Sequence, residues 1–186
     1  MALHSSRRVY HGRVIDLDLD EVEFPNGTRG QLEMIRHPGA AAVVPFLDPP
    51  TAPDPRVVLI RQFRHAADAH IYEIPAGRLD HEESPDQCAR RELSEETGYR
   101  AAQVALLTTI YTTPGFTDER IHLFWAVDLR AGQPAREPDE LIEPVILRWS
   151  ALWERVRHGE IADAKTLTAL LWCEAFVRGR AEQVPT

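Results

Sequence analysis

The chain has few cysteines, no long apolar run and no excess of basic residues. Its two cysteines, Cys88 and Cys173, show no paired spacing, so the sequence predicts neither a disulfide framework nor a zinc knuckle. We expect both thiols to be buried and free. No stretch approaches the roughly 20 apolar residues of a membrane span, and the first residues do not resemble a signal peptide. These absences lead us to expect a cytoplasmic protein.

The charge balance of the chain is acidic, with a formal net charge of -8. Nucleic acids and anionic membranes usually bind to basic patches, so we expect neither as a partner. A content of 44% hydrophobic and 27% charged residues is ordinary for a globular protein, and 186 residues suffice for one main domain with a small appendage. A small anionic substrate would need a local bridge, such as a metal ion.

Apolar patterning indicates an N-terminal β element followed by a larger α/β region. Residues 13–24 alternate apolar with acidic residues, the turn Pro-Asn-Gly follows, and residues 30–37 complete the pattern of an antiparallel hairpin. Residues 40–46 and 56–63 predict two buried strands separated by a proline-rich loop. The remaining expected elements are a short strand near 71–75, strands at 103–111, 121–129 and 142–149, and two helices that follow Ser150 and Asp163.

One helix carries complete signals at both ends. Ser84 suits the N-cap, Pro85 the first turn and Gln87 the capping-box position. Gly98 suits the position just past the last turn. The spacing predicts a helix of about three and a half turns.

Three carboxylates share one face of this predicted helix: Glu92, Glu95 and Glu96. Like charges at these spacings repel, and the helix C-terminus also disfavours anions. Arg91 can reach Glu95 one turn away and hold it in place. A solvated acidic surface is one interpretation. The other is a site for a divalent cation, because hard ions such as Mg²⁺ bind carboxylate oxygens and would remove the repulsion.

The wider stretch from Gly77 to Tyr99 decides between these interpretations. It resembles the Nudix box, Gx5Ex7REUxEExGU with U a bulky apolar residue, and matches it at every fixed position. Only Tyr99 departs, being aromatic where the pattern usually has an aliphatic residue. The resemblance implies a Nudix α/β/α sandwich with a mixed sheet, in which water attacks a diphosphate with the help of a metal ion.

The resemblance also implies roles for the residues of the box. Glu92 and Glu96 would be direct ligands of Mg²⁺, with Mn²⁺ as the alternative ion, and the carbonyl of Ala76 would be a backbone ligand. Glu95 would be a further ligand, or an orienting group in catalysis. Three residues are expected to support this site: Gly77, Glu83 and Arg91.

Selectivity for substrate has to come from outside the box. The loop YTTPGFTDER at 111–120 looks like that of the ADP-ribose pyrophosphatase branch, as do RQFR at 61–64, YEIPAG at 72–77 and GEIADAKT at 159–166. This resemblance implies hydrolysis of ADP-ribose to AMP and ribose 5-phosphate. Another nucleoside diphosphate sugar, of the ADP-glucose or GDP-mannose type, is the alternative. A non-catalytic ADP-ribose sensor would instead predict an eroded box, which this sequence does not have.

Four residues are candidates for substrate binding. Arg64 would contact the nucleotide, or could simply pair with an acidic neighbour at a strand end. Glu119 would accept hydrogen bonds from ribose hydroxyls, or could be an exposed loop carboxylate. Arg36 is a further candidate, although arginines on such hairpins often serve packing. Gly115 lies in the substrate loop, where it shapes the turn together with Pro114.

The general base is expected outside the box. In the branch that the chain resembles, the base often lies on a loop ahead of the last strand, which here is AREPDELIE at 135–143. We expect Glu140, just before the apolar pair Leu-Ile, to take the proton from the attacking water, with Glu137 as the alternative.

The resemblance divides the chain into residues 1–38, an N-terminal β module, and residues 39–186, the Nudix hydrolase domain. In similar proteins the N-terminal element swaps across a homodimer and completes the substrate site. We therefore expect a homodimer.

Overall fold

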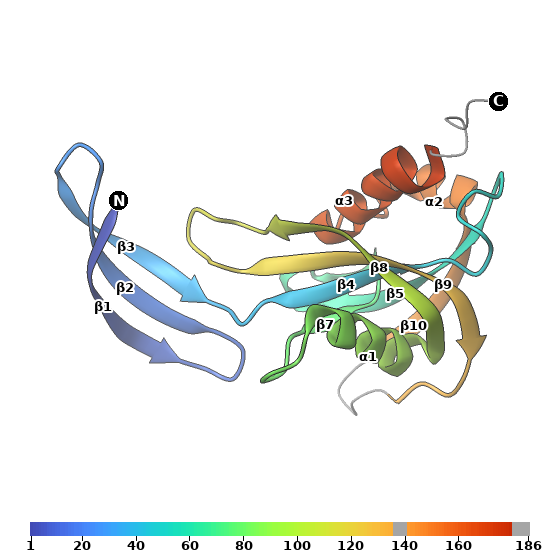
Figure 1. Cartoon of the computed structure of the whole chain (residues 1–186), viewed down its shortest axis with the longest axis horizontal. Coiled ribbons are helices and arrows are strands. Elements are labelled where there is room, and N and C mark those ends of the chain that lie inside the picture. The colour runs from blue at the N-terminus through green and yellow to red at the C-terminus, as the bar shows by residue number, and fades with distance from the viewer. Residues whose placement is uncertain (136–140, 180–186) are drawn as a thin grey trace.

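The computed structural model describes residues 1–135 and 141–179. Figure 1 shows a three-stranded N-terminal sheet that stands to one side of an α/β body, and the end of β3 leads directly into β4. The body contains a mixed sheet with helices packed on it. This arrangement confirms the predicted α/β class with a mixed sheet.

The N-terminal sheet has the order β1-β2-β3 and is antiparallel throughout. The predicted hairpin is confirmed in β2 (Asp16–Glu23) and β3 (Arg29–Arg36), and Gly27 in the turn between them has a φ of 81°. Strand β1 (Ala2–His11) lies outside the predicted pattern. All ten of its residues are exposed, so it carries no buried apolar face that the sequence could display.

The body contains two sheets that pack together. The mixed sheet has the order β7-β4-β9-β8, in which β4 and β9 are parallel and the other neighbours antiparallel. The second sheet has the order β10-β5-β6 and is antiparallel. The bounds are β4 Ala40–Pro45, β5 Arg56–Arg64, β6 Ala69–Glu73, β7 Ala76–Arg78, β8 Tyr99–Tyr111, β9 Arg120–Ala131 and β10 Ile142–Arg148, with a short 3₁₀ helix, η1, at His65–Ala67.

Helix α1 (Pro85–Thr97) begins and ends where the sequence predicts. The Ser84 hydroxyl accepts a hydrogen bond from the Gln87 amide at 3.3 Å, and the Gln87 side chain accepts one from the Ser84 amide at 3.0 Å. Gly98 closes the helix with a φ of 77°, and its amide donates to the Ser94 carbonyl. This capping fixes the position of the carboxylates along α1.

The C-terminal helices follow β10. Helix α2 (Trp149–Arg157) begins two residues earlier than a helix that follows Ser150 would, and the Ser150 amide and hydroxyl both bond to Asp54 instead of capping the helix. Asp163 caps α3 (Ala164–Trp172) as predicted, and η2 (Cys173–Arg178) continues from it. None of the helices in the described residues is long and apolar enough to cross a bilayer.

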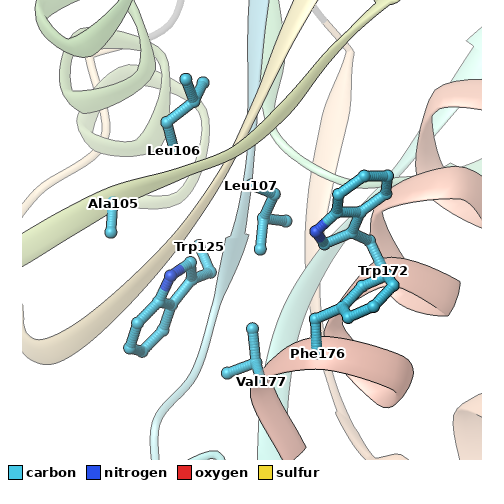
Figure 2. A pocket seen from close by; sticks show the side chains of 7 residues that line it. All are labelled: Ala105, Leu106, Leu107, Trp125, Trp172, Phe176 and Val177. Atoms are coloured by element: carbon cyan, nitrogen blue, oxygen red, sulfur yellow. The ribbon is translucent and has the colours of Figure 1, made fainter.

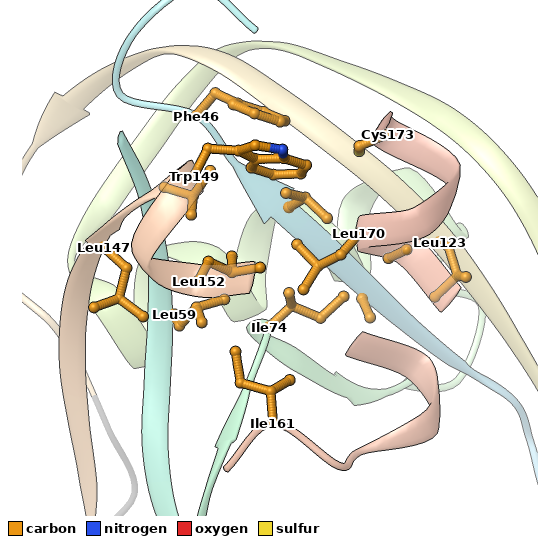
Figure 3. Close-up of a cluster of buried hydrophobic side chains, with 14 of the residues drawn as sticks. Phe46, Leu59, Ile74, Leu123, Leu147, Trp149, Leu152, Ile161, Leu170 and Cys173 are labelled. Atoms are coloured by element: carbon orange, nitrogen blue, oxygen red, sulfur yellow. The ribbon is translucent and has the colours of Figure 1, made fainter. Parts of the chain in front are cut away.

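Strand β4 lies at the centre of the core and is buried on both faces, which explains its continuous apolar sequence. Val44 belongs to the cluster beneath α2 and α3, where Phe46 stacks on Trp149 with 5.5 Å between ring centroids (Figure 3). Val43 belongs to a second cluster beneath α1. Both cysteines are buried and free, as predicted, and burial raises the pKa of each thiol to about 12.

An apolar cleft of about 470 Å³ lies between the β8–β9 pair and the α3–η2 segment. In Figure 2, Trp125 and Leu107 face Phe176 and Val177 across it, while Leu106 points away on the other side of β8. Among the residues that the structure describes, no charged side chain lines this cleft. The carboxylates of α1 line a different cleft.

Candidate functional site

The three carboxylates of helix α1 differ in how far they are exposed to solvent. Glu92 and Glu96 are only 8% and 3% exposed, whereas the Glu95 side chain is 38% exposed. The interpretation of a merely solvated acidic face is therefore wrong for Glu92 and Glu96. Burying two carboxylates on one helix is unfavourable unless other groups compensate their charge.

The backbone of β7 lies directly against these two carboxylates. The amide of Ala76 donates a hydrogen bond to Glu96 Oε2 at 3.0 Å. A Cβ atom added at Gly77 would lie 1.8 Å from Glu92 Oε1, so only glycine permits this close approach. The glycine that opens the box is thus explained by contact with a glutamate fifteen positions further along the sequence.

Arg91 provides the positive charge of the cluster. Its Nε and Nη2 both donate to the Glu83 carboxylate at 2.8 Å, and its Nη1 donates to Glu92 at 2.6 Å and to Glu95 at 3.1 Å. The predicted contact between Arg91 and Glu95 is present. The contact with Glu83, which precedes the helix, arises because helical side chains point towards the N-terminus.

Glu83 and Arg91 shift each other's pKa. Hydrogen bonding from Arg91 lowers the pKa of Glu83 to about 2, and the Asp80 amide adds a further hydrogen bond to that carboxylate. The pKa of Arg91 is raised, chiefly by its hydrogen bonds to Glu83. Glu83 therefore holds Arg91 in place beside the carboxylates of α1.

These groups line a polar cleft of about 250 Å³ between α1 and β7. Its lining residues are Ala76, Gly77, Arg78, Asp80, Arg91, Glu92, Glu95 and Ala135. The Ala135 amide donates to the carbonyl of Glu95 at 3.1 Å, which places the start of the loop after β9 beside this cleft. Glu137 and Glu140, the two candidates for the base, lie outside the described residues.

The donor set of this cleft suits a hard cation. Carboxylate oxygens from α1 and main-chain groups at Ala76 and Gly77 come together, and oxygen donors of this kind are what Mg²⁺ prefers. Among residues 1–135 and 141–179, no three acidic, histidine or cysteine side chains are already arranged as an ion site. Arg91 is the cation that Glu92 and Glu95 share here. The assignment of individual ligands remains a prediction.

The substrate loop is attached to the N-terminal sheet. The Ile35 amide donates to the Phe116 carbonyl at 2.8 Å, and the Asp118 side chain accepts from the His37 amide at 2.9 Å. Within the loop, Glu119 accepts a hydrogen bond from the Thr112 hydroxyl at 2.9 Å. Gly115 is open, with nothing within 4 Å of a Cβ built on it. The loop is thus held at its base, and its tip is free of contacts at this glycine.

The two candidate arginines both contact acidic neighbours. Arg36 bonds to Asp18 at 3.1 Å, to Asp118 at 3.4 Å and also to Asp20. Arg64 donates from Nε to Glu73 at 2.8 Å. The structural alternatives named for both arginines are therefore present in the fold. Contact of either one with substrate remains a prediction.

Sequence reasoning missed the acidic partners of these arginines. Asp118 stands within PGFTDE and Glu73 within YEIPAG, so both belong to segments that the resemblance had already singled out. The register of the β5–β6 hairpin places Glu73 opposite Ile60 and Arg64 opposite Ala69, so strand pairing alone would not have pointed to this contact. No local spacing points to Asp118 as a partner of Arg36.

Comparison with known proteins agrees with this geometry. The NUDIX domain family model matches residues 36–171. The ADP-ribose pyrophosphatase of Bacillus subtilis (strain 168) is 37% identical over 172 residues, which cover 91% of this chain and 90% of the relative. The methanol dehydrogenase activator of Bacillus methanolicus is 36% identical over 171 residues, with the same coverage.

A solved structure described as an ADP compounds hydrolase has a TM-score of 0.82 to this chain at 21% identity. The likeness covers 98% of this chain and 96% of that one, and at this identity it bears on the fold alone. The complete box, the buried carboxylates against β7 and the family match agree with one another. The chain therefore belongs to the Nudix family and is a Nudix pyrophosphatase.

Proposed function

We propose that this pyrophosphatase hydrolyses ADP-ribose to AMP and ribose 5-phosphate, with Mg²⁺ as its metal ion and Mn²⁺ as the alternative. The observation that carries the proposal is the polar cleft in which α1 holds two buried carboxylates against the backbone of β7. The choice of ADP-ribose is supported by the similarity to the Bacillus subtilis ADP-ribose pyrophosphatase along nearly the whole chain.

The metal ligands in this proposal are Glu92, Glu96, Glu95 and the carbonyl of Ala76. When bound, the ion neutralises diphosphate charge and lowers the pKa of a bound water. The protein's part is to hold the carboxylates close together. Arg91, fixed by Glu83, performs this role because it offsets their mutual repulsion.

Glu140 is the proposed general base, with Glu137 as the alternative. Both ends of the segment that contains them have defined neighbours. Ala135 bonds to Glu95 in the polar cleft, and Ile142 pairs with Gln62 near the end of β5. In this proposal the Glu140 carboxylate takes the proton from the attacking water.

Arg64, Glu119, Arg36 and Gly115 are the proposed substrate-binding residues. Arg64 would bind the nucleotide part, and its side chain is 42% exposed. Glu119 would accept hydrogen bonds from ribose hydroxyls, close to the open tip of the loop at Gly115. Arg36 would approach substrate from the base of the N-terminal sheet, where three aspartates hold it.

The N-terminal module, residues 1–38, is proposed to swap across a homodimer. Strand β1 lies at the edge of its sheet, and Leu3 and Tyr10 on it are 60% and 57% exposed. An uncovered edge strand with exposed apolar side chains is suited to contact with a second chain. Light scattering at micromolar concentration should give the mass of a dimer, and a monomer would contradict the proposal.

The substrate is tested by a panel of ADP-ribose, ADP-glucose and GDP-mannose assayed with Mg²⁺, with Mn²⁺ and with chelator. We expect the highest kcat/KM for ADP-ribose, the products AMP and ribose 5-phosphate, and no turnover with chelator. Hydrolysis of ADP-ribose no faster than of the other compounds would reject the substrate assignment but not the family.

A further inference from the structure

Lys165 is the only lysine in the chain, in which the other twenty formally cationic residues are arginines. It lies in the first turn of α3, and its side chain is only 12% exposed. Lysine is rarely buried unless its charge is paired. A single lysine in such a position therefore points to a specific partner.

The ammonium group of Lys165 bridges two carboxylates. Its Nζ lies 2.6 Å from Glu73 Oε1 and 3.1 Å from Asp163 Oδ2. The Glu73 side chain is 3% exposed, so this carboxylate is enclosed at the end of β6. A compact ammonium with three donors suits the space between two carboxylates, whereas a guanidinium is larger and planar.

Glu73 connects Lys165 to Arg64. While Oε1 of Glu73 faces Lys165, its Oε2 accepts a hydrogen bond from Arg64 Nε at 2.8 Å. Within the described part of the chain, this is the one hydrogen bond of the Arg64 side chain, and its two Nη groups have no protein partner. Arg64 is thus held by one nitrogen, with its other donors available to a ligand.

We propose that Lys165, acting through Glu73, is a positioning residue that keeps the Nη groups of Arg64 free for a phosphate of the substrate. The inference rests on the proposed function, in which Arg64 contacts the nucleotide part. Because Lys165 engages Oε1, Arg64 reaches only Oε2. Without Lys165, the guanidinium can bind both oxygens of Glu73 side-on, as arginine prefers with carboxylates, and an Nη donor is withdrawn from the substrate.

The test is a double-mutant cycle with ADP-ribose and Mg²⁺ on the full chain, using Lys165→Met, Arg64→Ala and their combination. Lys165→Met keeps much of the aliphatic stem and removes the charge. We expect it to raise KM about tenfold, as for one charge-assisted hydrogen bond, with kcat changed less than about twofold. In the Arg64→Ala background the same change should alter KM less than about twofold.

Removal of one partner from a buried ion pair can unfold a protein, so Glu73→Gln/Lys165→Met is the second variant. It removes both charges of the Glu73–Lys165 pair, and Asp163 keeps its hydrogen bonds from the Thr166 amide and hydroxyl. It should fold, and KM should rise less than in Lys165→Met, because the introduced amide offers Arg64 only one oxygen acceptor. Glu174→Gln is the matched control, because this carboxylate accepts from Trp149 Nε1 at 2.6 Å and from Arg178 Nε at 3.1 Å on a different network. It should lower Tm and leave KM unchanged.

The outcomes separate the two proposals. If Arg64→Ala does not change KM, the nucleotide contact is wrong and the positioning role of Lys165 falls with it. If Arg64→Ala raises KM but Lys165→Met does not, or if Glu73→Gln/Lys165→Met itself raises KM about tenfold, only the positioning role is wrong. An equal effect of Lys165→Met in both backgrounds would show that it acts through general structure, and this too would overturn the inference.

Discussion

Helix α1 and the N-terminal sheet both concentrate acidic side chains, and they bury them to a similar degree. Asp18 and Asp20 on β2 are each 6% exposed, close to the values of 8% and 3% for Glu92 and Glu96 on α1. The partners of these carboxylates differ. On the sheet, Arg8 and Arg36 reach Asp18 from the strands on either side.

On α1, by contrast, the carboxylates meet the main chain of β7 and an open cleft. Three glutamates share the single guanidinium of Arg91. Burial of acidic groups therefore does not by itself distinguish a structural network from a site for a cation. The distinguishing features are backbone that approaches the carboxylates and space beside them for a ligand.

Replacement of a proposed metal ligand should have the largest effect. On this assignment, Glu92→Gln is expected to lower kcat on ADP-ribose by about four orders of magnitude, because the ion would lose a carboxylate ligand and the attacking water would lose its activation. Isothermal titration should show much weaker Mg²⁺ binding. Asp20→Asn is the matched change on the sheet and should retain Mg²⁺ binding. Normal Mg²⁺ affinity in Glu92→Gln would remove the contrast between the two regions.

Replacement of the proposed base should have the next largest effect. Glu140→Gln is expected to lower kcat by about three orders of magnitude, as for loss of general base catalysis, with Mg²⁺ and substrate affinity nearly intact. Rapid-quench single-turnover assays measure the chemical step directly. Glu137→Gln is the comparison and should retain most of the activity. Unchanged turnover in Glu140→Gln would reject the assignment.

The close approach of β7 to α1 predicts a third effect. Gly77→Ala places a Cβ 1.8 Å from the carboxylate of Glu92, so this carboxylate must leave its position. We expect about a hundredfold loss of kcat/KM from the displaced carboxylate and a loss of about 1–3 kcal/mol in stability.

Gly30→Ala is the control for this change. Its Cβ would meet a ring carbon of Phe24 at 2.7 Å, so this change also displaces a side chain, but one that does not line the polar cleft. This variant should retain full activity. Equal losses of activity in the two variants would mean that the approach of β7 to α1 has no special role.

The features that could be predicted from the sequence are those encoded locally. The ends of α1 follow from capping residues within one turn, and the box follows from spacing along a short segment. Strand β1 could not be predicted, because all of its residues are exposed and show no buried face. The contact between Lys165 and Glu73 joins residues 92 positions apart, and only the assembled fold brings them together.

The smallest expected effect is the change in stability when Glu83 is protonated. It tests whether Glu83 holds Arg91 through its charge. Hydrogen bonds from Arg91 lower the pKa of Glu83 from an ordinary 4.5 to about 2. A carboxylate with a lowered pKa in the folded state contributes stability that is complete above its unfolded pKa and is lost as the pH falls through its folded pKa. The contribution of Glu83 should therefore disappear between about pH 4.5 and pH 2.

Urea unfolding of the wild type and Glu83→Gln, with chelator present, measures this contribution. We expect the wild type to be more stable by about 1–2 kcal/mol at pH 7, because part of the ion-pair energy is screened by solvent. The difference should stay constant down to about pH 5 and then shrink. Arg8 lowers the pKa of Asp18 in the same direction, so Asp18→Asn should show the same sign of pH dependence. A difference for Glu83→Gln that persists unchanged at pH 2 would mean that its charge does not hold Arg91, and the two acidic regions would then differ in their electrostatics as well as in their surroundings.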